Sequence, residues 1–485
     1  MTAAAMESVL VERVPIEVDQ LERGPKQLHP PPDHSARSNS ENTYADETAL
    51  GKSTLRHEDI EGYSHSADYC QPTATAPSQA LVSSCPDTPG PLYPYMTAPG
   101  WSYVKVADGL HSPRDLIFDG QGRLLIIEEE IGLSQHLMDA HGCITHTRLL
   151  IENPDLTHGI CLSADRETLY ASSSSSVFSW TYDPTTGNVS QNPGLVISGM
   201  ATSGHITRTL TIPPHRTDLL VVSHGSDSNI DQDTSNPKVA RAIVKVFNIS
   251  SVPMGGYNFV SQGWNAGFGL RNEVGLAFDG NNMLWGVENS ADNLARTVNG
   301  TTTDVHTDNP SEELNFLGDV TLANDDWYGY PVCFTVWSPD ELSDRVFKVG
   351  QQFVQTPIPD FNDGTCAQIS VPPVLSFQAH SAPLGCKFDA RFSNLFVAMH
   401  GSWNRQPPTG YKVIAVPFAQ GPDGSYAPTA ASWSIRGSID VFYPPDETQC
   451  SSSTCIRPVG LAFDAAGRLY VTSDASGEVF FLSQG

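Results

Sequence analysis

The stretch that decides the fold is RNEVGLAFDGNNMLWGVENSADNL, residues 271–294. Its centre is an apolar run, a polar turn and a second apolar run, which together predict a β-hairpin. Polar side chains gather at the open end of this hairpin: Arg271, Asn272, Glu288 and Asp292. Such a group can bind an anion or a metal ion, or it can form a salt-bridged turn. This hairpin alone leaves both interpretations open.

The same pattern of strand, polar turn and strand recurs along the chain. The other units are residues 113–129, 158–180, 205–228, 380–403 and 457–482. A recurring β-unit that cannot bury its own faces becomes stable when copies stack side by side, and this is typical of a β-propeller. The sequence therefore predicts an all-β protein, a six-bladed β-propeller. A β-sandwich with chance similarity between hairpins is the alternative.

The repeats also set the expected domain organisation. Residues 1–90 are polar and lack periodicity, so we expect them to be disordered or to lie outside the mature protein. Residues 91–485 form the propeller, and strands near Trp101 and at residues 478–482 are candidates to close its ring. The longest insertion, residues 299–371, separates the fourth and fifth units. Its aromatic segment WYGYP, residues 327–331, either lines a sugar site or anchors a loop.

The composition narrows the classes of function. The chain of 485 residues has a formal net charge of −27, which argues against binding to nucleic acid or to an anionic membrane. No apolar run is long enough for a membrane span. An acidic balance is compatible with an extracellular protein acting on neutral substrates such as sugars.

The cysteines and glycosylation sequons point to secretion. Among the nine cysteines, Cys450 and Cys455 flank a short loop and Cys333 and Cys366 lie in one insertion, so either pair can form a disulfide. Two others lie in apolar strands and are expected to be buried thiols: Cys161 and Cys386. Three Asn-x-Ser/Thr sequons fit a secreted glycoprotein: Asn188, Asn248 and Asn299.

The start of the sequence conflicts with secretion, because it has no apolar core long enough for a signal peptide. Either the protein stays inside the cell or its true start differs from this one, and we favour the second interpretation.

Polar residues occupy matching places in the hairpins. Those at or just before the first strand of their unit are Arg114, His158, His205, Arg271 with Asn272, His380 and Arg457, and those after the second strand of the fifth unit are His400, Trp403 and Arg405. Equivalent positions of different blades ring the propeller axis at one end, so we expect these side chains to meet in one pocket. Converging arginines require an anion between them, and a neutral histidine can act as a general base. The alternative is that each residue only forms hydrogen bonds at its blade edge.

Five segments of the chain resemble a known family. They are RNEVGLAFD (271–279), LWGVEN (284–289), YGYP (328–331), HGSWNR (400–405) and RPVGLAF (457–463). They are similar to the fungal pyrroloquinoline-quinone-dependent pyranose dehydrogenases and, more remotely, to the bacterial soluble quinoprotein glucose dehydrogenases. The resemblance covers about residues 101–485. It implies a six-bladed propeller that holds pyrroloquinoline quinone (PQQ) and Ca²⁺ above the axial channel.

The resemblance also implies roles for individual residues. Arg114 and Arg457 would bind the cofactor carboxylates, and Trp403 with His400 would contact its ring plane, while Arg271 with Asn272 would lie beside the quinone and stabilise negative charge there. His205 is the expected general base. His158 is the second choice for the base and otherwise a residue of the cofactor pocket. Arg208 is harder to assign, since strand alternation places it on the opposite face from His205.

The same resemblance implies a calcium site built from main-chain carbonyls, those of Ser290 and Ala291. Carboxylate ligation through Glu288 or Asp292 is the alternative for a hard cation.

The sequence thus predicts a secreted, PQQ- and Ca²⁺-dependent enzyme that oxidises the anomeric C1 hydroxyl of pyranose sugars to lactones. Its electrons would pass to an external acceptor, such as a haem domain or a redox enzyme, and we expect a monomer without nucleic-acid or membrane partners. Two rival functions remain. One is a Ca²⁺-dependent lactonase with Glu288, Asn272 and Asp292 as metal ligands, and the other is a non-catalytic propeller that binds glycans or proteins.

Overall fold

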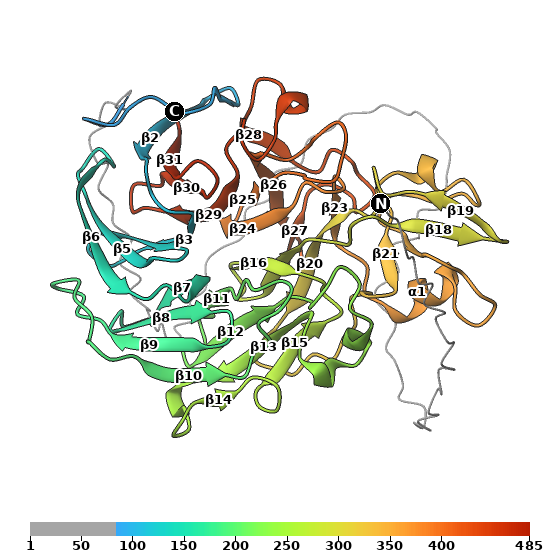
Figure 1. Cartoon of the computed structure of the whole chain (residues 1–485), viewed down its shortest axis with the longest axis horizontal. Coiled ribbons are helices and arrows are strands. Elements are labelled where there is room, and N and C mark those ends of the chain that lie inside the picture. Colours follow the sequence, from blue (N-terminus) through green and yellow to red (C-terminus); the bar gives the residue numbers. More distant parts are fainter. Residues whose placement is uncertain (1–83) are drawn as a thin grey trace, which may run out of the picture. The chain divides into compact units, whose positions relative to one another are not determined.

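The computed structural model describes residues 84–485, so the prediction for residues 1–90 falls almost wholly outside it. Six antiparallel sheets follow one another along the described chain, and each is one blade of a β-propeller (Figure 1). The first strand of every blade contacts the first strand of the next, and the series closes when the sixth returns to the first. The predicted six-bladed propeller is therefore confirmed. No helix within residues 84–485 is long and apolar enough to cross a membrane.

The first three blades are regular. Blade 1 contains β3 (Pro113–Phe118), β4 (Leu124–Glu128), β5 (Gly132–Met138) and β6 (Ile144–Glu152). Blade 2 contains β7 (Leu156–Leu162), β8 (Thr168–Ser173), β9 (Val177–Thr181) and β10 (Gly194–Ser198), to which β14 (Tyr257–Asn258) adds in parallel. Blade 3 contains β11 (Leu210–Thr211), β12 (Leu219–His224), β13 (Ile243–Asn248) and β15 (Trp264–Phe268).

The last three blades carry the additions. Blade 4 contains β16 (Glu273–Phe278), β17 (Leu284–Glu288), β20 (Glu312–Gly318) and β23 (Leu375–Phe377). Blade 5 contains β24 (Pro383–Phe388), β25 (Asn394–Met399), β26 (Lys412–Gln420) and β28 (Ile439–Tyr443), with β1 (Met96–Thr97) beside β28 and β27 (Tyr426–Pro428) beside β26. Blade 6 contains β29 (Pro458–Phe463), β30 (Leu469–Ser473), β31 (Glu478–Gln484) and β2 (Trp101–Ala107).

Blade 6 joins the two ends of the described chain. Strand β2 pairs antiparallel with the last strand β31, from Trp101 opposite Gln484 to Ala107 opposite Val479. This pairing confirms the predicted ring closure. It also covers the outer edge of β31 and makes β2 the edge strand of the blade.

Glycines on the inner strands let neighbouring blades approach closely. A Cβ added at Gly275 in β16 would overlap the carbonyl oxygen of Leu384 in the next blade, and one added at Gly460 in β29 would overlap that of Arg114. Only glycine fits where two backbones are this near. The glycine in the recurring VGLAF segments is thus explained by packing around the axis.

The turn at the closed end of four of the six hairpins is fixed by an aspartate. In blade 4, Asp279 Oδ1 accepts hydrogen bonds from the backbone N–H groups of Asn281 and Met283, at 2.8 and 3.0 Å. Its Oδ2 accepts from the indole of Trp285 at 3.0 Å, and that side chain is buried between blades 4 and 5. The same arrangement of two backbone N–H donors recurs at Asp119, Asp389 and Asp464.

The insertion predicted at residues 299–371 needs a correction. Strand β20 lies inside that range and is the third strand of blade 4, paired with β17 from Glu288 opposite Glu313 onward. The true additions are the hairpin of β18 (Ala295–Val298) with β19 (Thr301–Asp304), the pair of β21 (Cys333–Thr335) with β22 (Gln352–Val354), and helix α1 (Asp363–Ile369). The sequence of β20 begins with the polar residues EELN, so it was not recognised as a strand, although most of its residues are buried.

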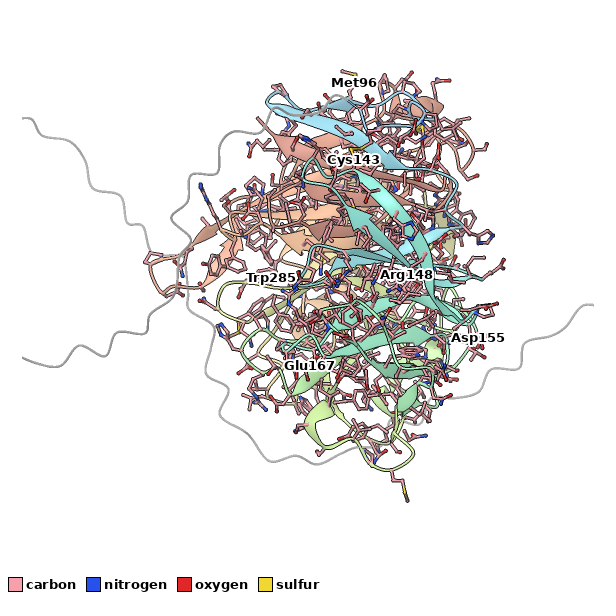
Figure 2. All side chains as sticks on the ribbon, turned by 90° about the vertical axis from the view of Figure 1, so that its left-hand side faces the viewer. Met96, Cys143, Arg148, Asp155, Glu167 and Trp285 are labelled. Carbon is pink, nitrogen blue, oxygen red and sulfur yellow. A yellow bond between two sulfur atoms is a disulfide. The ribbon has the colours of Figure 1, made fainter. Side chains whose placement is uncertain are left out.

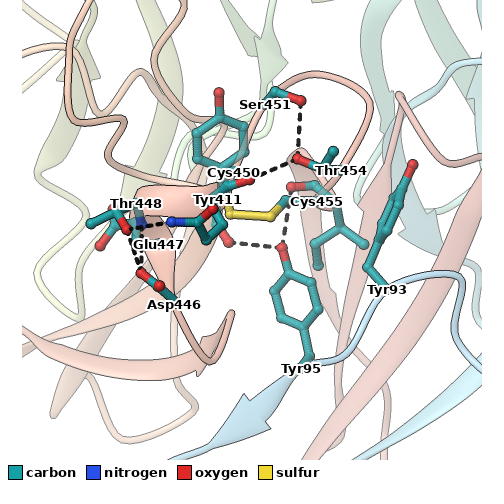
Figure 3. The surroundings of a disulfide bond; sticks show 12 residues. Tyr93, Tyr95, Tyr411, Asp446, Glu447, Thr448, Cys450, Ser451, Thr454 and Cys455 are labelled. Atoms are coloured by element: carbon teal, nitrogen blue, oxygen red, sulfur yellow. Dashed lines mark hydrogen bonds between the residues drawn. A yellow bond between two sulfur atoms is a disulfide. The ribbon is translucent and has the colours of Figure 1, made fainter.

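Three disulfide bonds cross-link the described chain. The predicted pairs Cys333–Cys366 and Cys450–Cys455 are confirmed, and a third bridge, Cys85–Cys143, was not predicted. Cys386 is a buried thiol as expected, while Cys161 is only partly buried. Figure 2 labels Cys143 and Figure 3 shows the surroundings of Cys450–Cys455.

Candidate active site

A cavity of about 170 Å³ opens at the end of the propeller opposite the aspartate turns. It is lined by residues that precede the inner strand or follow the second strand of blades 3 to 6, and by Glu312 at the start of β20. They are His205, Arg271, Asn272, Asn289, Ser290, Asp292, Glu312, His380, Ala382, His400, Gly401, Trp403, Asn404 and Arg457. Residues far apart in the sequence therefore meet at one place, as expected for equivalent positions of different blades. Arg405 was also expected there, but it is not among the lining residues and donates to Asp308 instead.

His205 lies in the loop that leads into β11 and is held at its Nδ1 atom. That atom is 3.0 Å from the carbonyl oxygen of Ser226 and 3.1 Å from its hydroxyl. Because a carbonyl oxygen can only accept, Nδ1 carries the proton and Nε2 keeps a free lone pair. Burial, reinforced by the positive charge of Arg271, lowers the pKa of His205 to about 4. The imidazole is thus neutral near pH 7.

Arg208 supports the His205 loop from below. It is fully buried, and its guanidinium donates to four backbone carbonyls, those of Ala201, Ser174, His205 and Thr207. Arg208 does not line the cavity. Its hydrogen bonds instead fix the backbone of the loop that carries His205.

Arg271 is held between two loops. Its guanidinium donates to Asn229 Oδ1 at 2.9 Å and to Asp292 Oδ2 at 3.0 Å. Asn229 lies in a loop that Tyr330 anchors, since the phenol donates to the carbonyl of Asn229 at 3.1 Å. The aromatic segment at 327–331 therefore anchors a loop here and is not among the residues that line the cavity.

Asp292 also contacts His380, at 3.5 Å from its Nδ1. Burial alone would lower the pKa of His380, but the bond to Asp292 and the charge of Glu312 outweigh it and raise the pKa. Burial likewise acts to raise the pKa of Asp292, but His380 and Arg271 hold it below its usual value. The Asp292 carboxylate is therefore negatively charged, and at the cavity wall it pairs with Arg271 and His380.

Beneath the cavity lies a buried cluster of glutamates. Glu288 Oε1 accepts from the backbone N–H of Arg271 at 2.6 Å, and Glu312 Oε2 accepts from that of Ser290 at 2.7 Å. Burial raises the pKa of Glu312 to about 7 and raises that of Glu288 well above its usual value. These two carboxyl groups fix the backbone of Arg271 and of Ser290, which both line the cavity. Glu273 and Glu313 complete the cluster.

Arg457 is fixed by its own neighbourhood in blades 5 and 6. Its guanidinium donates to the carbonyls of His400 and Gly401 at 3.1 and 3.0 Å, and it lies 5.9 Å from the centre of the Tyr411 ring. Tyr411 packs on the Cys450–Cys455 bridge, and Tyr95 donates to the Tyr411 carbonyl at 3.1 Å (Figure 3). The disulfide loop thus braces the loop that carries Arg457.

Arg114 and His158 do not line this cavity but lie next to it. Arg114 donates to Asp474 at 2.6 Å, and the same carboxylate is 2.9 Å from His400 Nε2. Burial acts to raise the pKa of Asp474, but His400 and Arg114 outweigh burial and hold it below its usual range. Burial lowers the pKa of His158, and the charge of Arg114 lowers it further.

Residues 95–485 match the model of the family described as TrAA12-like. The chain belongs to the TrAA12-like family. It is 40% identical over 408 residues to the pyrroloquinoline quinone-dependent pyranose dehydrogenase of Coprinopsis cinerea, and the match covers 83% of this chain and 56% of that protein. This TrAA12-like chain thus spans little more than half the length of that relative.

Further comparisons agree. The TrAA12-like chain is 35% identical over 401 residues to the pyrroloquinoline quinone-dependent sugar dehydrogenase of Hypocrea jecorina, covering 80% of this chain and 89% of that one. The holo PQQ domain of the pyranose dehydrogenase from Coprinopsis cinerea superposes with a TM-score of 0.80 at 40% identity, over 82% of this chain and 99% of that chain. A calcium structure of the Trichoderma reesei family AA12 enzyme superposes with a TM-score of 0.78 at 35% identity, over 83% of this chain and 100% of that chain.

Buried polar atoms around the TrAA12-like cavity test whether its residues suit an anionic, hydrogen-bonding cofactor. Within residues 84–485, the atoms Arg114 Nε, His158 Nδ1, and both Nδ2 and Oδ1 of Asn404 are buried without a hydrogen-bond partner. Buried polar groups are nearly always paired in native proteins. A planar ligand with carboxylates and ring heteroatoms would pair such atoms, and the cationic residues nearby match its charge, so the residues fit PQQ.

Two residues singled out from the sequence have contrasting surroundings. Trp403 lines the cavity with 70% of its surface exposed, so its ring stands at the mouth. Ala291 is buried in an apolar cluster with Tyr330 and Phe334, while its neighbour Ser290 lines the cavity.

Within the described residues, no group of three or more His, Cys, Asp or Glu side chains is arranged to hold a metal ion.

Sequence reasoning missed several members of this TrAA12-like site. Asn404 lies inside the recognised HGSWNR segment and could have been found there. Asp474 follows the second strand of the last hairpin, where Asn289 and His400 stand in theirs, so the repeat itself was the available signal. Glu312 offered none, because its segment was assigned to an insertion.

Proposed function

We propose that this chain is a PQQ-dependent sugar dehydrogenase that oxidises the anomeric C1 hydroxyl of pyranoses to the lactone. The observation that carries the proposal is the meeting of a neutral histidine, His205, with two arginines, Arg271 and Arg457, in one cavity. Family membership and the names of the two curated relatives support it. When bound, PQQ supplies an ortho-quinone that accepts a hydride.

The cationic residues would hold the cofactor. Arg457 and Arg114 would bind its carboxylates, while His158, His400 and Trp403 would contact the remainder of the ring system. Asn404 would pair its free amide atoms with the ligand. Arg271 and Asn272 would lie at the quinone edge, where a guanidinium stabilises negative charge most effectively when water is excluded. The bonds of Arg271 to Asn229 and Asp292 keep it oriented beforehand.

His205 would act as the general base. Its Nδ1–H is committed to Ser226, so the lone pair of Nε2 is available to take the proton of the anomeric hydroxyl. The lowered pKa of about 4 keeps that lone pair free across the neutral and mildly acidic range. The Arg208 framework would maintain the ring position during turnover.

We propose Ca²⁺ as the second cofactor, with the carbonyls of Ser290 and Ala291 as ligands. The hydrogen bond from Ser290 N–H to Glu312 fixes the backbone that would present them. The carboxylate alternatives have other contacts, because Glu288 accepts from Arg271 N–H and Asp292 pairs with Arg271 and His380. The calcium structure of the Trichoderma reesei relative supports the ion rather than these ligands.

The deciding experiment loads the metal-free protein with PQQ, with Ca²⁺, with both or with neither, and follows dye reduction over a panel of aldoses. We expect activity only with PQQ, strengthened by Ca²⁺, and NMR of the product should show the lactone. If Ca²⁺ alone supports lactone hydrolysis and PQQ neither binds nor confers activity, the lactonase alternative replaces this proposal.

We also propose that the protein is secreted, glycosylated and monomeric, and that it reduces an external redox partner. The three disulfides need an oxidising compartment, and the sequon residues Asn188 and Asn299 are exposed. Intact mass before and after enzymatic deglycosylation, together with light scattering, tests the first three statements.

A further inference from the structure

A second hollow opens at the same end of the propeller as the catalytic cavity. This blade 1–2 cleft is lined by residues at the ends of the first two strands of blades 1 and 2 and by Ile206 from the loop that leads into blade 3. They include Ser112, Glu129, Asp155, Thr157 and Ser174. Its volume is about 490 Å³, against about 170 Å³ for the catalytic cavity. A volume in this range, roughly 300–1,000 Å³, is typical of small-molecule sites.

Covalent continuity and side-chain contacts link the cleft to the catalytic cavity. Ile206 in its wall directly follows the proposed base His205, and the Thr157 hydroxyl is within 3.4 Å of the Ile206 carbonyl, which it can reach across the blade boundary. On the other side Arg114 lies 3.9 Å from Glu129 of the cleft and 2.6 Å from Asp474. The cleft therefore adjoins the catalytic cavity at residues 205–206.

The lining has the chemistry that recognises sugar hydroxyls. Glu129, Glu130 and Asp155 offer carboxylate acceptors, and the hydroxyls of Ser112 and Thr157 lie among them. Pro154 and Ile206 add apolar surface against which the C–H face of a sugar ring can pack. Three carboxylates would repel an anionic ligand, and they can accept hydrogen bonds from the hydroxyls of a neutral one.

We propose that the blade 1–2 cleft is a subsite for the glycosyl unit attached to the sugar being oxidised. The enzyme would take the reducing-end ring of a neutral disaccharide or longer oligosaccharide beside His205 and the next ring in the cleft. This inference rests on the proposed dehydrogenase function and names its substrate class. Binding energy from the second ring would raise kcat/KM above the value for the free monosaccharide.

Asp155 is the residue to change, because it is exposed and its hydrogen bond to Asn153 is made by the backbone N–H rather than by the carboxylate. Asp155→Ala removes an acceptor, Asp155→Asn keeps an oxygen acceptor, and Asp155→Trp fills the cleft. The matched control is Glu167→Ala, an exposed carboxylate in the turn at the closed end of the same blade. Figure 2 labels Asp155 and Glu167 at separate places on the molecule.

The test compares steady-state dye reduction by the PQQ-loaded enzyme with glucose, cellobiose and maltose. We expect kcat/KM for at least one disaccharide to fall about tenfold in Asp155→Ala and further in Asp155→Trp, mainly through KM, while glucose oxidation changes less than about twofold. Asp155→Asn should recover part of the loss, and Glu167→Ala should match the wild type.

The proposal is overturned if the wild type oxidises glucose but neither disaccharide, or if Asp155→Trp oxidises the disaccharides as well as the wild type does. Both results leave the dehydrogenase function intact. If the wild type reduces no dye with any sugar, the proposed function itself fails, so the two failures are distinguishable.

Discussion

The two ends of the propeller hairpins are built from the same repeats and behave in opposite ways. At the closed ends, Asp119, Asp279, Asp389 and Asp464 each accept two backbone N–H groups of their own turn. At the open ends, the equivalent places hold different residues, such as His205, Arg271 and Arg457, whose contacts reach into other blades and loops.

The difference teaches how to separate structure from chemistry in a repeat protein. A residue that recurs in several copies serves the unit, because those copies have the same turn to close. A residue that differs from copy to copy serves the assembly, because the copies face one another there. If this distinction holds, open-end substitutions should change activity and closed-end substitutions should change stability.

The largest effect is expected for His205→Ala. Loss of a general base typically costs about 10²–10⁴ in rate, or about 3–5 kcal/mol of transition-state stabilisation, and the melting temperature should not fall. Steady-state dye reduction with PQQ-loaded enzyme measures this. His215→Ala, an exposed histidine at the closed end of the same blade, is the control. If His158→Ala loses the activity instead, the base has been assigned to the wrong histidine.

A somewhat smaller effect, of the opposite kind, is expected for Asp279→Ala. Three buried or partly buried N–H donors lose their acceptor, so the free energy of unfolding should fall by about 2–4 kcal/mol. Asp389→Ala removes the same turn acceptor where the turn is more exposed and water can replace it, so about 1 kcal/mol is expected. Thermal unfolding measures both. A drop in kcat/KM for either folded variant would contradict the distinction between the two ends.

Arg457→Ala should weaken PQQ binding by about 10- to 100-fold, since a charge-assisted hydrogen bond is typically worth about 1.5–3 kcal/mol. Titration of the apo protein with PQQ, followed by fluorescence, gives the Kd. Arg457→Lys should recover only part of the affinity, because an ammonium lacks the planar fork. Arg216→Ala, at a closed end, is the matched control, and an unchanged Kd in Arg457→Ala would remove Arg457 from the cofactor site.

The smallest effect is a pH dependence of about tenfold per pH unit. His205 must be neutral to accept a proton, and its pKa is lowered to about 4. We therefore expect kcat/KM to be flat from pH 7 to about 5 and to fall below about pH 4, where the imidazole becomes protonated. An acidic limb near the ordinary histidine pKa of about 6.5 would show that another histidine limits the rate.

The fold was predictable because its signal is repeated. Alternation of apolar residues, turn residues after each first strand and the glycine of VGLAF recur, so chance patterns in one unit are outweighed by the others. Strand β20 escaped, because its EELN letters look polar although the strand is buried between other parts of blade 4. The pair Cys85–Cys143 escaped because its members lie 58 residues apart with no shared motif.

The candidate site was predictable by position rather than by contact. The repeat placed His205, Arg271 and Arg457 at one end of the ring, and the cavity brings them together. It could not show that Asp474 joins Arg114 to His400, since those contacts cross from blade 6 to blades 1 and 5. Contacts across a ring depend on side-chain orientation, which strand pattern alone does not determine.

The pairing of β2 with β31 has a consequence for how a cell makes this protein. The ribosome delivers β2 first, and its partner follows about 370 residues later. At synthesis rates of roughly 5–20 residues per second, the first strand must wait about 20–75 seconds for the last. During that interval its edge is open to other chains, and blades 1 to 5 can form only an unclosed arc. A chain truncated before β31 would leave this arc permanently open, so the synthesis of β31 is the step that allows the propeller to close.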